Sequence, residues 1–230
     1  MTERKKRIRA LVVRFPGSNC DFDTLRFFRR FGHEAEFLWY KERSIPRVDL
    51  VVLPGGFAFG DRVYARATDA YAINPGVQAL QTPIMGVLRT YAKRGGAILG
   101  ICNGFQILVH AGLLPGTLVR NKSGNFFCDI VSCKVTGQSF FGDVRLAGKT
   151  IGIPVAHGYG RYLLAARERA KLERENRIFL RYAQENPNGS DDGIAGVVNE
   201  SGTIFGMLPH PERSRDAGVF MRAIEKYVLA

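Results

Sequence analysis

Apolar and polar residues form blocks along the chain that predict strands and helices in turn. A short continuous apolar run predicts a strand buried in a sheet, whereas apolar residues three or four positions apart predict an amphipathic helix. In the first half of the chain, runs typical of strands lie at residues 8–15, 34–40, 49–53 and 97–101. Helical spacing falls at residues 21–31, 83–93 and 104–111.

The order of these elements predicts the class of fold, because strands that alternate with helices form a parallel sheet covered on both faces. The second half adds strand-like segments and a final helix at residues 127–135, 150–155, 193–198, 203–207 and 217–228. Residues 199–202, Asn-Glu-Ser-Gly, have the composition of a hairpin turn between two of these strands. We therefore expect an α/β fold: a doubly wound, mostly parallel sheet with an antiparallel portion.

Length and composition suit one globular domain. Of the 230 residues, 46% are hydrophobic, which is enough for one large core, and no linker or internal repeat divides the chain. We expect a single domain over residues 1–230, with a basic N-terminal arm at about residues 1–7. No apolar stretch approaches the roughly 20 residues of a membrane span, and the N-terminus lacks the apolar region of a signal peptide. We expect a cytoplasmic protein without a membrane partner.

The positive charge of the chain raises the question of nucleic acid. The net charge is +12, from 33 basic and 21 acidic residues, and residues 1–10 and 161–181 each contribute a net +4. Residues 161–181 combine helical spacing with charges of both signs, which predicts a solvated helix face. Neither aromatic–basic interleaving nor a helix-turn-helix pattern is present, so we expect no nucleic acid partner. An acidic protein partner, or a phosphorylated substrate bound by a partner, fits the charge equally well.

One of the four cysteines has a context typical of a nucleophile. Residues 100–104, Gly-Ile-Cys-Asn-Gly, are the cysteine form of the nucleophile elbow, with a predicted strand before and a predicted helix after. The glycines relieve crowding at a sharp corner, and the helix N-terminus favours a thiolate at Cys102. The Asn103 N–H could face a developing oxyanion. The alternative is a buried structural cysteine.

The other three cysteines, Cys20, Cys128 and Cys133, lack such a corner, and we interpret them as structural. The chain has no C-x-x-C pair and only four histidines, so we expect no metal site.

A base for this cysteine is available in residues 208–212, Leu-Pro-His-Pro-Glu, which also follow a predicted strand. A cysteine that attacks an amide needs a proton carrier for the leaving nitrogen, and histidine is the usual one. The two prolines restrict the backbone around His210, and in an extended stretch Glu212 points the same way and can orient the imidazole. The alternative is a turn histidine followed by an ordinary helix-start acid.

A third loop, residues 54–61, Pro-Gly-Gly-Phe-Ala-Phe-Gly-Asp, follows another buried strand and could offer backbone N–H groups to an oxyanion. Its alternative is a plain turn between a strand and a helix. All three loops are expected at the carboxyl ends of sheet strands, where ligands bind in folds of this class.

Six segments in order along the chain together resemble a known family. They are residues 16–21 (PGSNCD), 54–61 (PGGFAFGD), 102–106 (CNGFQ), 154–158 (PVAHG), 186–190 (NPNGS) and 207–213 (MLPHPER). The pattern is similar to the class I, triad-type glutamine amidotransferases, which have a flavodoxin-like fold. Within that class it resembles the glutaminase subunits of phosphoribosylformylglycinamidine synthase, an enzyme of de novo purine biosynthesis.

The resemblance implies that the chain hydrolyses L-glutamine to glutamate and ammonia through a thioester on Cys102, with His210 as proton carrier and Glu212 orienting it. It implies an oxyanion site made by Asn103 and the backbone of Gly55, Gly56 and Phe57. It also implies substrate contacts from Gln106, His157, Gly158 and Tyr159. No cofactor and no metal are expected in this chain.

The resemblance further implies partners. Ammonia would pass to a large ATP-dependent synthetase subunit that converts formylglycinamide ribonucleotide to formylglycinamidine ribonucleotide, with ATP and magnesium on that subunit, and a small third subunit would complete the complex. Two features depart from the family pattern: residues 62–82 are longer than expected, as a lid or a partner contact would be, and the basic N-terminal arm is long.

Two rival interpretations remain. A cysteine hydrolase similar to the Parkinson-associated deglycase and intracellular protease group would share the elbow, but that group places histidine directly after the cysteine, where this chain has Asn103. A non-catalytic basic interaction module would leave Cys102 replaceable.

Overall fold

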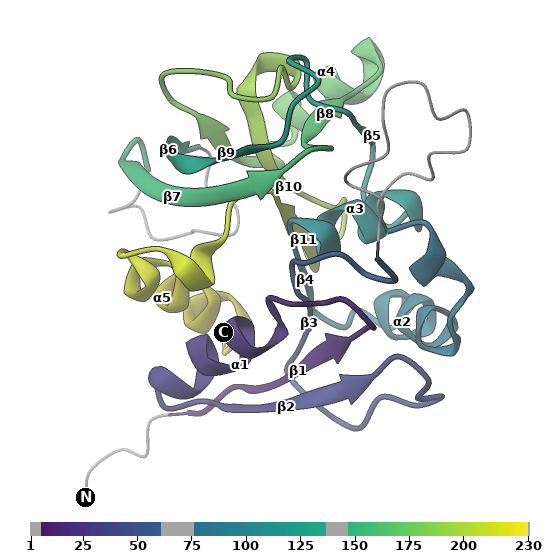
Figure 1. The fold of residues 1–230 in the computed structure, drawn as a ribbon. Helices are drawn as coiled ribbons and strands as arrows, with labels where there is room; N and C mark the ends of the chain where they lie inside the picture. The colour runs from purple at the N-terminus through teal and green to yellow at the C-terminus, as the bar shows by residue number, and fades with distance from the viewer. Residues whose placement is uncertain (1–5, 61–75, 137–146, 230) are drawn as a thin grey trace, which may run out of the picture.

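The computed structural model describes residues 6–60, 76–136 and 147–229, which form a nine-stranded sheet flanked by helices (Figure 1). The strands of this sheet are β1 (Arg9–Arg14), β2 (Glu34–Trp39), β3 (Leu50–Leu53), β4 (Ile98–Ile101), β6 (Phe127–Val135), β7 (Thr150–His157), β9 (Ile178–Tyr182), β10 (Ile194–Val198) and β11 (Ile204–Met207). A separate antiparallel pair joins β5 (Thr117–Val119) to β8 (Arg161–Leu163).

The α-helices are α1 (Asp21–Arg30), α2 (Pro83–Lys93), α3 (Asn103–His110), α4 (Ala166–Arg174) and α5 (Ala217–Val228). Three short 3₁₀ segments are η1 (Gln78–Gln81), η2 (Asp191–Gly193) and η3 (Pro211–Arg213). Within the described residues, no helix is long and apolar enough to cross a lipid bilayer.

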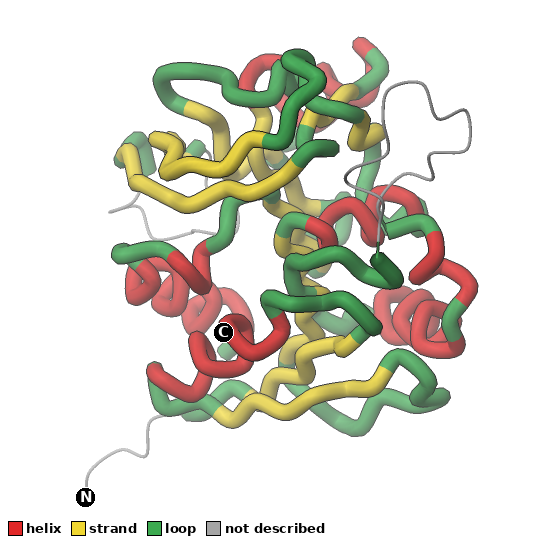
Figure 2. Tube along the Cα trace, viewed as in Figure 1, coloured by secondary structure: helices red, strands yellow, loops and turns green. Residues whose placement is uncertain are grey.

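The large sheet has a parallel half and an antiparallel half. The strand order is β2-β1-β3-β4-β11-β10-β9-β6-β7; the first five strands are parallel to one another, and every pairing from β11 onward is antiparallel. Figure 2 shows the same division: in the lower part of the view red helices flank the yellow strands, and in the upper part strands and loops predominate.

Two apolar layers cover the two faces of the parallel half. On one face, α1 and α5 bury residues such as Phe28 and Phe220, and on the other, α2 and α3 bury residues such as Leu88 and Phe105 (Figure 1). Each large apolar side chain buried in this way stabilises the fold by about 1.5–3 kcal/mol. The expected doubly wound, mostly parallel sheet with an antiparallel portion is confirmed.

The prediction for residues 161–181 is wrong in part. Only the middle of this segment is helical, as α4, while its two ends are the strands β8 and β9. The helix buries a single side chain, Leu172, so a solvated face is found there, but Tyr162 and Phe179 are fully buried in strands. Evenly spaced charges concealed two short apolar runs.

The topology of the parallel half positions the three loops singled out in the sequence. Strands β3, β4 and β11 are direct neighbours, and Ile98 of β4 pairs in register with both Val51 of β3 and Ile204 of β11. Their carboxyl ends therefore lie side by side. The loops at residues 54–60, 102–106 and 208–214 meet there, as expected for ligand-binding loops.

The two departures from the family pattern lie only partly within the described chain. Residues 62–75 of the long 62–82 segment and residues 1–5 of the N-terminal arm are outside the described residues. The described end of the long segment packs on α3: a Cβ at Gly76 would lie 2.9 Å from Ile107 Cγ1.

Candidate active site

The predicted elbow at Cys102 is present between β4 and α3. Cys102 has φ +49°, a conformation rare for residues with a side chain, so the corner stores backbone strain. A Cβ at Gly104 would lie 2.0 Å from the Leu53 carbonyl oxygen, and one at Gly100 would lie 2.8 Å from the Gly104 carbonyl oxygen. Only glycine fits at both positions, which explains the spacing read from the sequence.

The thiol of Cys102 lies at the N-terminus of α3 beside β7. Its Sγ donates a weak hydrogen bond to the Ala156 carbonyl at 3.6 Å, and the Cys102 backbone N–H donates to the Met207 carbonyl at 2.8 Å. The second bond ties the elbow to the end of β11, the strand that leads to His210. The helix dipole at this position favours a negative charge on the sulfur.

His210 and Glu212 form a buried pair just beyond β11. The His210 Nδ1 atom lies 2.7 Å from Glu212 Oε1, and the two side chains are 2% and 0% exposed. The His210 backbone N–H donates to the Pro154 carbonyl on β7 at 2.8 Å. The expected contact between carboxylate and imidazole is present, but Glu212 lies in the 3₁₀ segment η3 and not in the extended stretch that the prediction assumed.

The charge state of His210 follows from its neighbours. Burial alone lowers the pKa of His210, but attraction to the Glu212 carboxylate and to the Cys102 sulfur raises this pKa well above its usual value. The Nε2 atom is buried without a hydrogen-bonded partner among the described residues, although the sulfur is near enough to affect the ring. These contacts favour the imidazolium form of His210.

The loop at residues 54–60 makes room for this imidazole. A Cβ at Gly55 would lie 2.6 Å from His210 Cε1 and 3.3 Å from the Cys20 sulfur. The close approach requires glycine at position 55. Cys20 is thus beside the His210 ring, which the sequence interpretation as a structural cysteine did not foresee. Its position after β1, in the turn that opens α1, was the signal that could have placed it here.

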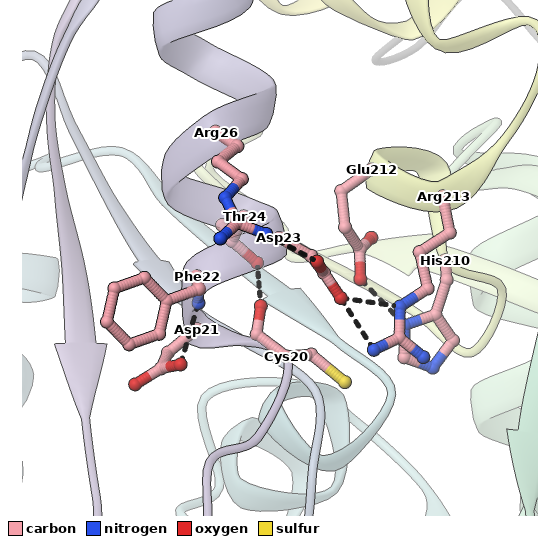
Figure 3. Close-up of polar contacts among 9 residues, drawn as sticks. All are labelled: Cys20, Asp21, Phe22, Asp23, Thr24, Arg26, His210, Glu212 and Arg213. Atoms are coloured by element: carbon pink, nitrogen blue, oxygen red, sulfur yellow. Dashed lines mark hydrogen bonds and ion pairs between the residues drawn. The ribbon is translucent and has the colours of Figure 1, made fainter.

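A second contact fastens the same region to α1. Arg213 donates from Nε and Nη2 to Asp23 Oδ2, at 2.9 and 2.6 Å, and joins η3 to the first turn of α1 (Figure 3). Figure 3 also shows the Cys20 sulfur on the side of His210 and Glu212, and one ligand atom from each of these three residues lies within 4.8 Å of the others. Sulfur, imidazole and carboxylate are donors that zinc accepts. In this structure the His210 imidazole and the Glu212 carboxylate already pair with each other.

One small pocket collects most of the other predicted residues. It is lined by Gly56, Phe57, Cys102, Gln106, Ala156, His157, Gly158 and Tyr159. The four residues expected to contact substrate therefore lie with the thiol around one space. Three of them belong to residues 157–160, which we call the pocket turn.

The predicted oxyanion donors are not equivalent. The Phe57 N–H donates to the Gly17 carbonyl at 2.8 Å and so already has an acceptor, whereas the Gly56 N–H has none among the described residues. The Asn103 side chain faces the loop, since its Oδ1 accepts a hydrogen bond from the Ala58 N–H at 3.2 Å.

Gln106 is tied to protein groups on both sides of its amide. Its Nε2 donates to the Tyr159 carbonyl at 2.8 Å, and its Oε1 accepts from Asn103 Nδ2 at 2.9 Å. In this arrangement Gln106 shapes the pocket wall.

The His157 ring lines the pocket without a hydrogen bond to another described residue. The pKa of His157 is lowered to about 4, mainly by burial and in part by the nearby charge of His210, while the polar groups of its own backbone act in the opposite direction. The ring is therefore neutral near pH 7, and within the described chain neither ring nitrogen has a hydrogen-bond partner.

The remaining cysteines lie elsewhere. Cys128 is exposed on β6, and Cys133 is buried on the same strand, where burial raises the pKa of its thiol to about 12. A thiol held protonated in this way is unsuited to nucleophilic attack, which supports the structural interpretation of Cys133.

The fold and this site define a class of enzyme. Residues 7–224 match the family of CobB/CobQ-like glutamine amidotransferase domains, and the chain belongs to this family. It is therefore an enzyme of the glutamine amidotransferase class, as the resemblance implied.

Particular relatives narrow the class. The chain is 45% identical over 212 residues to the phosphoribosylformylglycinamidine synthase subunit PurQ of Synechococcus sp. (strain JA-3-3Ab), a match that covers 91% of this chain and 90% of that protein. It is 43% identical over 208 residues to the subunit of the same name from Wolinella succinogenes, covering 89% and 90%. The family resemblance found in the sequence is confirmed.

Comparison with solved structures supports the same family. The chain is similar to a chain in the structure of PurLQS from Thermotoga maritima, with a TM-score of 0.83, 37% identity and coverage of 97% of this chain and 100% of that chain. A glutamine amidotransferase from Thermotoga maritima gives a TM-score of 0.56 at 20% identity, covering 96% and 83%, which shows the shared fold alone.

Proposed function

We propose that this chain is the glutaminase subunit of a phosphoribosylformylglycinamidine synthase and hydrolyses L-glutamine to glutamate and ammonia. The observation that carries the proposal is the convergence of the Cys102 thiol and the buried His210–Glu212 pair beside one pocket. Membership of the amidotransferase family and the similarity to PurQ subunits over most of the chain support the same conclusion.

The first half of the reaction forms a thioester. The Cys102 sulfur, as a thiolate, attacks the side-chain amide carbon of glutamine, and the carbonyl oxygen becomes an oxyanion. His210, protonated at the start, gives its proton to the amide nitrogen, the C–N bond breaks, and ammonia leaves. Glu212 holds the imidazole and stabilises its positive charge before the transfer.

The second half releases glutamate. His210, now neutral, takes a proton from a water molecule, and the resulting hydroxide attacks the thioester carbon. The C–S bond breaks, Cys102 leaves as a thiolate, and glutamate departs. The imidazolium–thiolate pair is restored, so no cofactor or metal is needed for this cycle.

The oxyanion is assigned first to the N–H groups of Gly56 and Asn103. The Phe57 N–H already has the Gly17 carbonyl as its acceptor, so Phe57 supports the loop. Gly55 contributes space for the His210 ring. One well-placed donor of this kind lowers the barrier by about 2.7–4 kcal/mol.

The partners follow from the relatives. The PurQ proteins are subunits of phosphoribosylformylglycinamidine synthase, and the similar chain in the structure from Thermotoga maritima is part of PurLQS. We propose that ammonia from this chain passes to a large synthetase subunit, which binds ATP and magnesium and aminates formylglycinamide ribonucleotide in the cytoplasm. A small third subunit completes the proposed complex.

The experiment measures glutamate release from glutamine, with and without the cognate synthetase subunits and their substrates. Cys102→Ala should abolish release in both cases, while Cys128→Ala, a change at the exposed thiol, should leave it unchanged. With Cys102→Ala present, external ammonia should still support the synthetase reaction, which a stand-alone cysteine hydrolase would not explain. Glutamate release by Cys102→Ala at the parent rate would contradict the mechanism.

A further inference from the structure

Residues 186–190, Asn-Pro-Asn-Gly-Ser, have no part in the mechanism above, although they are one of the six segments that indicated the family. In the structure they lie between β9 and η2, directly against the pocket turn. Asn188 is fully buried and Ser190 is 3% exposed. Buried polar side chains are costly unless each finds partners, so their contacts show what the segment holds in place.

Asn188 holds the end of the pocket turn. Its Nδ2 donates to the Gly160 carbonyl at 2.8 Å and to the Tyr182 hydroxyl at 3.1 Å. Its Oδ1 accepts from the Ser190 hydroxyl at 2.7 Å and from the Ser190 N–H at 3.0 Å. Every hydrogen-bonding position of the amide is therefore used, and Gly160 is joined to the core through it.

Asn121, which follows β5, holds the same turn from the other side. Its Nδ2 donates to the His157 carbonyl at 2.8 Å, and its Oδ1 accepts from the Gly160 N–H at 2.9 Å. Its own backbone N–H donates to the Gly158 carbonyl at 2.9 Å. Asn121 is 3% exposed, so these bonds are shielded from water.

The two amides and Gln106 together account for the pocket turn. Gln106 binds the Tyr159 carbonyl, Asn121 binds the backbone of His157, Gly158 and Gly160, and Asn188 binds the Gly160 carbonyl. The turn begins one residue after Ala156, whose carbonyl accepts the hydrogen bond from the Cys102 thiol. The position of this pocket wall relative to the sulfur is thus fixed by Gln106 within the pocket and by the amides of Asn121 and Asn188, which do not line it.

We propose that Asn121 and Asn188 are positioning residues for glutamine: they hold the pocket turn at the separation from Cys102 that the substrate needs. The inference rests on the proposed function and adds two residues that act through His157, Gly158 and Tyr159. Loss of either amide loosens the wall and leaves the elbow and the His210–Glu212 pair in place. Substrate binding should therefore suffer more than the chemical step.

The test compares steady-state glutaminase kinetics of the assembled complex for Asn121→Ala, Asn188→Ala and a matched control. Asn199→Ala is the control, because Asn199 Oδ1 also accepts two backbone N–H bonds, from Thr203 and Ile204, but lies at the opposite end of β11 from His210. We expect KM for glutamine to rise about tenfold in the two test variants, the size of one lost buried hydrogen bond, with kcat changed by less than about threefold. The control should retain the parent KM.

A conservative variant sharpens the test. Asn188→Asp keeps the shape and the acceptor for Ser190 but has no proton for the Gly160 carbonyl while it is ionised. Burial raises the pKa of such a carboxyl, and once protonated it can donate again. The KM of Asn188→Asp, relative to that of Asn188→Ala at each pH, should fall as pH is lowered, a trend that general loosening of the fold would not produce.

A second readout does not depend on turnover. Alkylation of Cys102 by iodoacetamide, followed by peptide mass spectrometry, should proceed at the parent rate in Asn188→Ala, while alkylation by a chloroketone analogue of glutamine should slow about tenfold. Equal KM values in the test and control variants, with both alkylation rates unchanged, would overturn the inference and leave the proposed function standing. Absence of Cys102-dependent glutamate release by the parent complex would instead remove the proposed function.

Discussion

The parallel and antiparallel halves of the sheet contribute to the site in different ways. The parallel strands β3, β4 and β11 end at the loops that hold Gly56, Cys102 and His210, and backbone hydrogen bonds to neighbouring strands hold Cys102 and His210 in place. The pocket turn follows β7 in the antiparallel half and is held by Asn121 and Asn188, which lie 36 and 28 residues away in sequence from the groups they bind. The reacting groups are thus held mainly by backbone hydrogen bonds, and the binding wall is held mainly by the side-chain amides of Asn121 and Asn188.

The largest expected effect concerns the chemical step. His210→Ala should lower kcat for glutamine hydrolysis by at least about 10³-fold, because His210 is the imidazole held protonated beside Cys102, and Glu212→Gln should cost less. His33→Ala is the control. His33 is also buried, but it pairs with Glu225 and the Ile8 N–H near the start of β1, whereas the site lies at the carboxyl ends of the parallel strands. Activity of His210→Ala close to that of His33→Ala would show that the parallel half does not hold the proton carrier.

The next effect concerns the corner itself. Gly104→Ala should lower the free energy of unfolding by about 3 kcal/mol or more, since the new methyl group would meet the Leu53 carbonyl oxygen in a close-packed corner. Gly86→Ala, within α2, meets nothing within 4 Å and should raise the free energy of unfolding by about 0.5–1 kcal/mol. Urea unfolding of the two variants measures both. Similar stabilities would contradict the close approach of elbow and loop.

A smaller effect concerns the antiparallel half and is visible in pH dependence. The folded state holds the pKa of His157 at about 4, whereas the unfolded chain restores a value of about 6.5, so the unfolded state takes up a proton first as the pH falls. The contribution of His157 to the free energy of unfolding is therefore present above pH 6.5 and is lost as the pH falls toward 4. The loss is about 2 kcal/mol between pH 7 and 4.5. Urea unfolding at pH 7 and 4.5 should show that the free energy of unfolding falls by about 2 kcal/mol less in His157→Gln than in the parent. An identical pH dependence in the variant would contradict the buried neutral ring.

Most of the parallel half could be predicted from the sequence. Strands buried on both faces appear as unbroken apolar runs, so β3 and β4 were placed within a residue, and glycines two positions either side of Cys102 indicated the corner. His210 was recognisable because prolines flank it. These signals are local, and the structure confirms the elements that depend on them.

Outside the parallel half the prediction was uneven for a physical reason: β6 was predicted with its bounds, Phe127–Val135, but β9 and the separate pair of β5 and β8 were not predicted. Short strands such as β8 and β9 lie beside a charged helix and have no periodicity long enough to identify them. The partners of Asn121 and Asn188, and the position of Cys20 beside His210, depend on contacts between segments far apart in sequence. The motif at residues 186–190 was noted, but its contact with the pocket turn could be seen only in three dimensions.

The most direct test of the central claim is to locate the covalent intermediate. The assembled complex is mixed with glutamine, quenched in acid and digested, and peptide mass spectrometry identifies which cysteine carries a glutamyl thioester. We predict the thioester on Cys102 and no modification of Cys20, although Cys20 also lies beside His210. A thioester on any other cysteine, or full glutaminase activity without one at Cys102, would contradict the assignment.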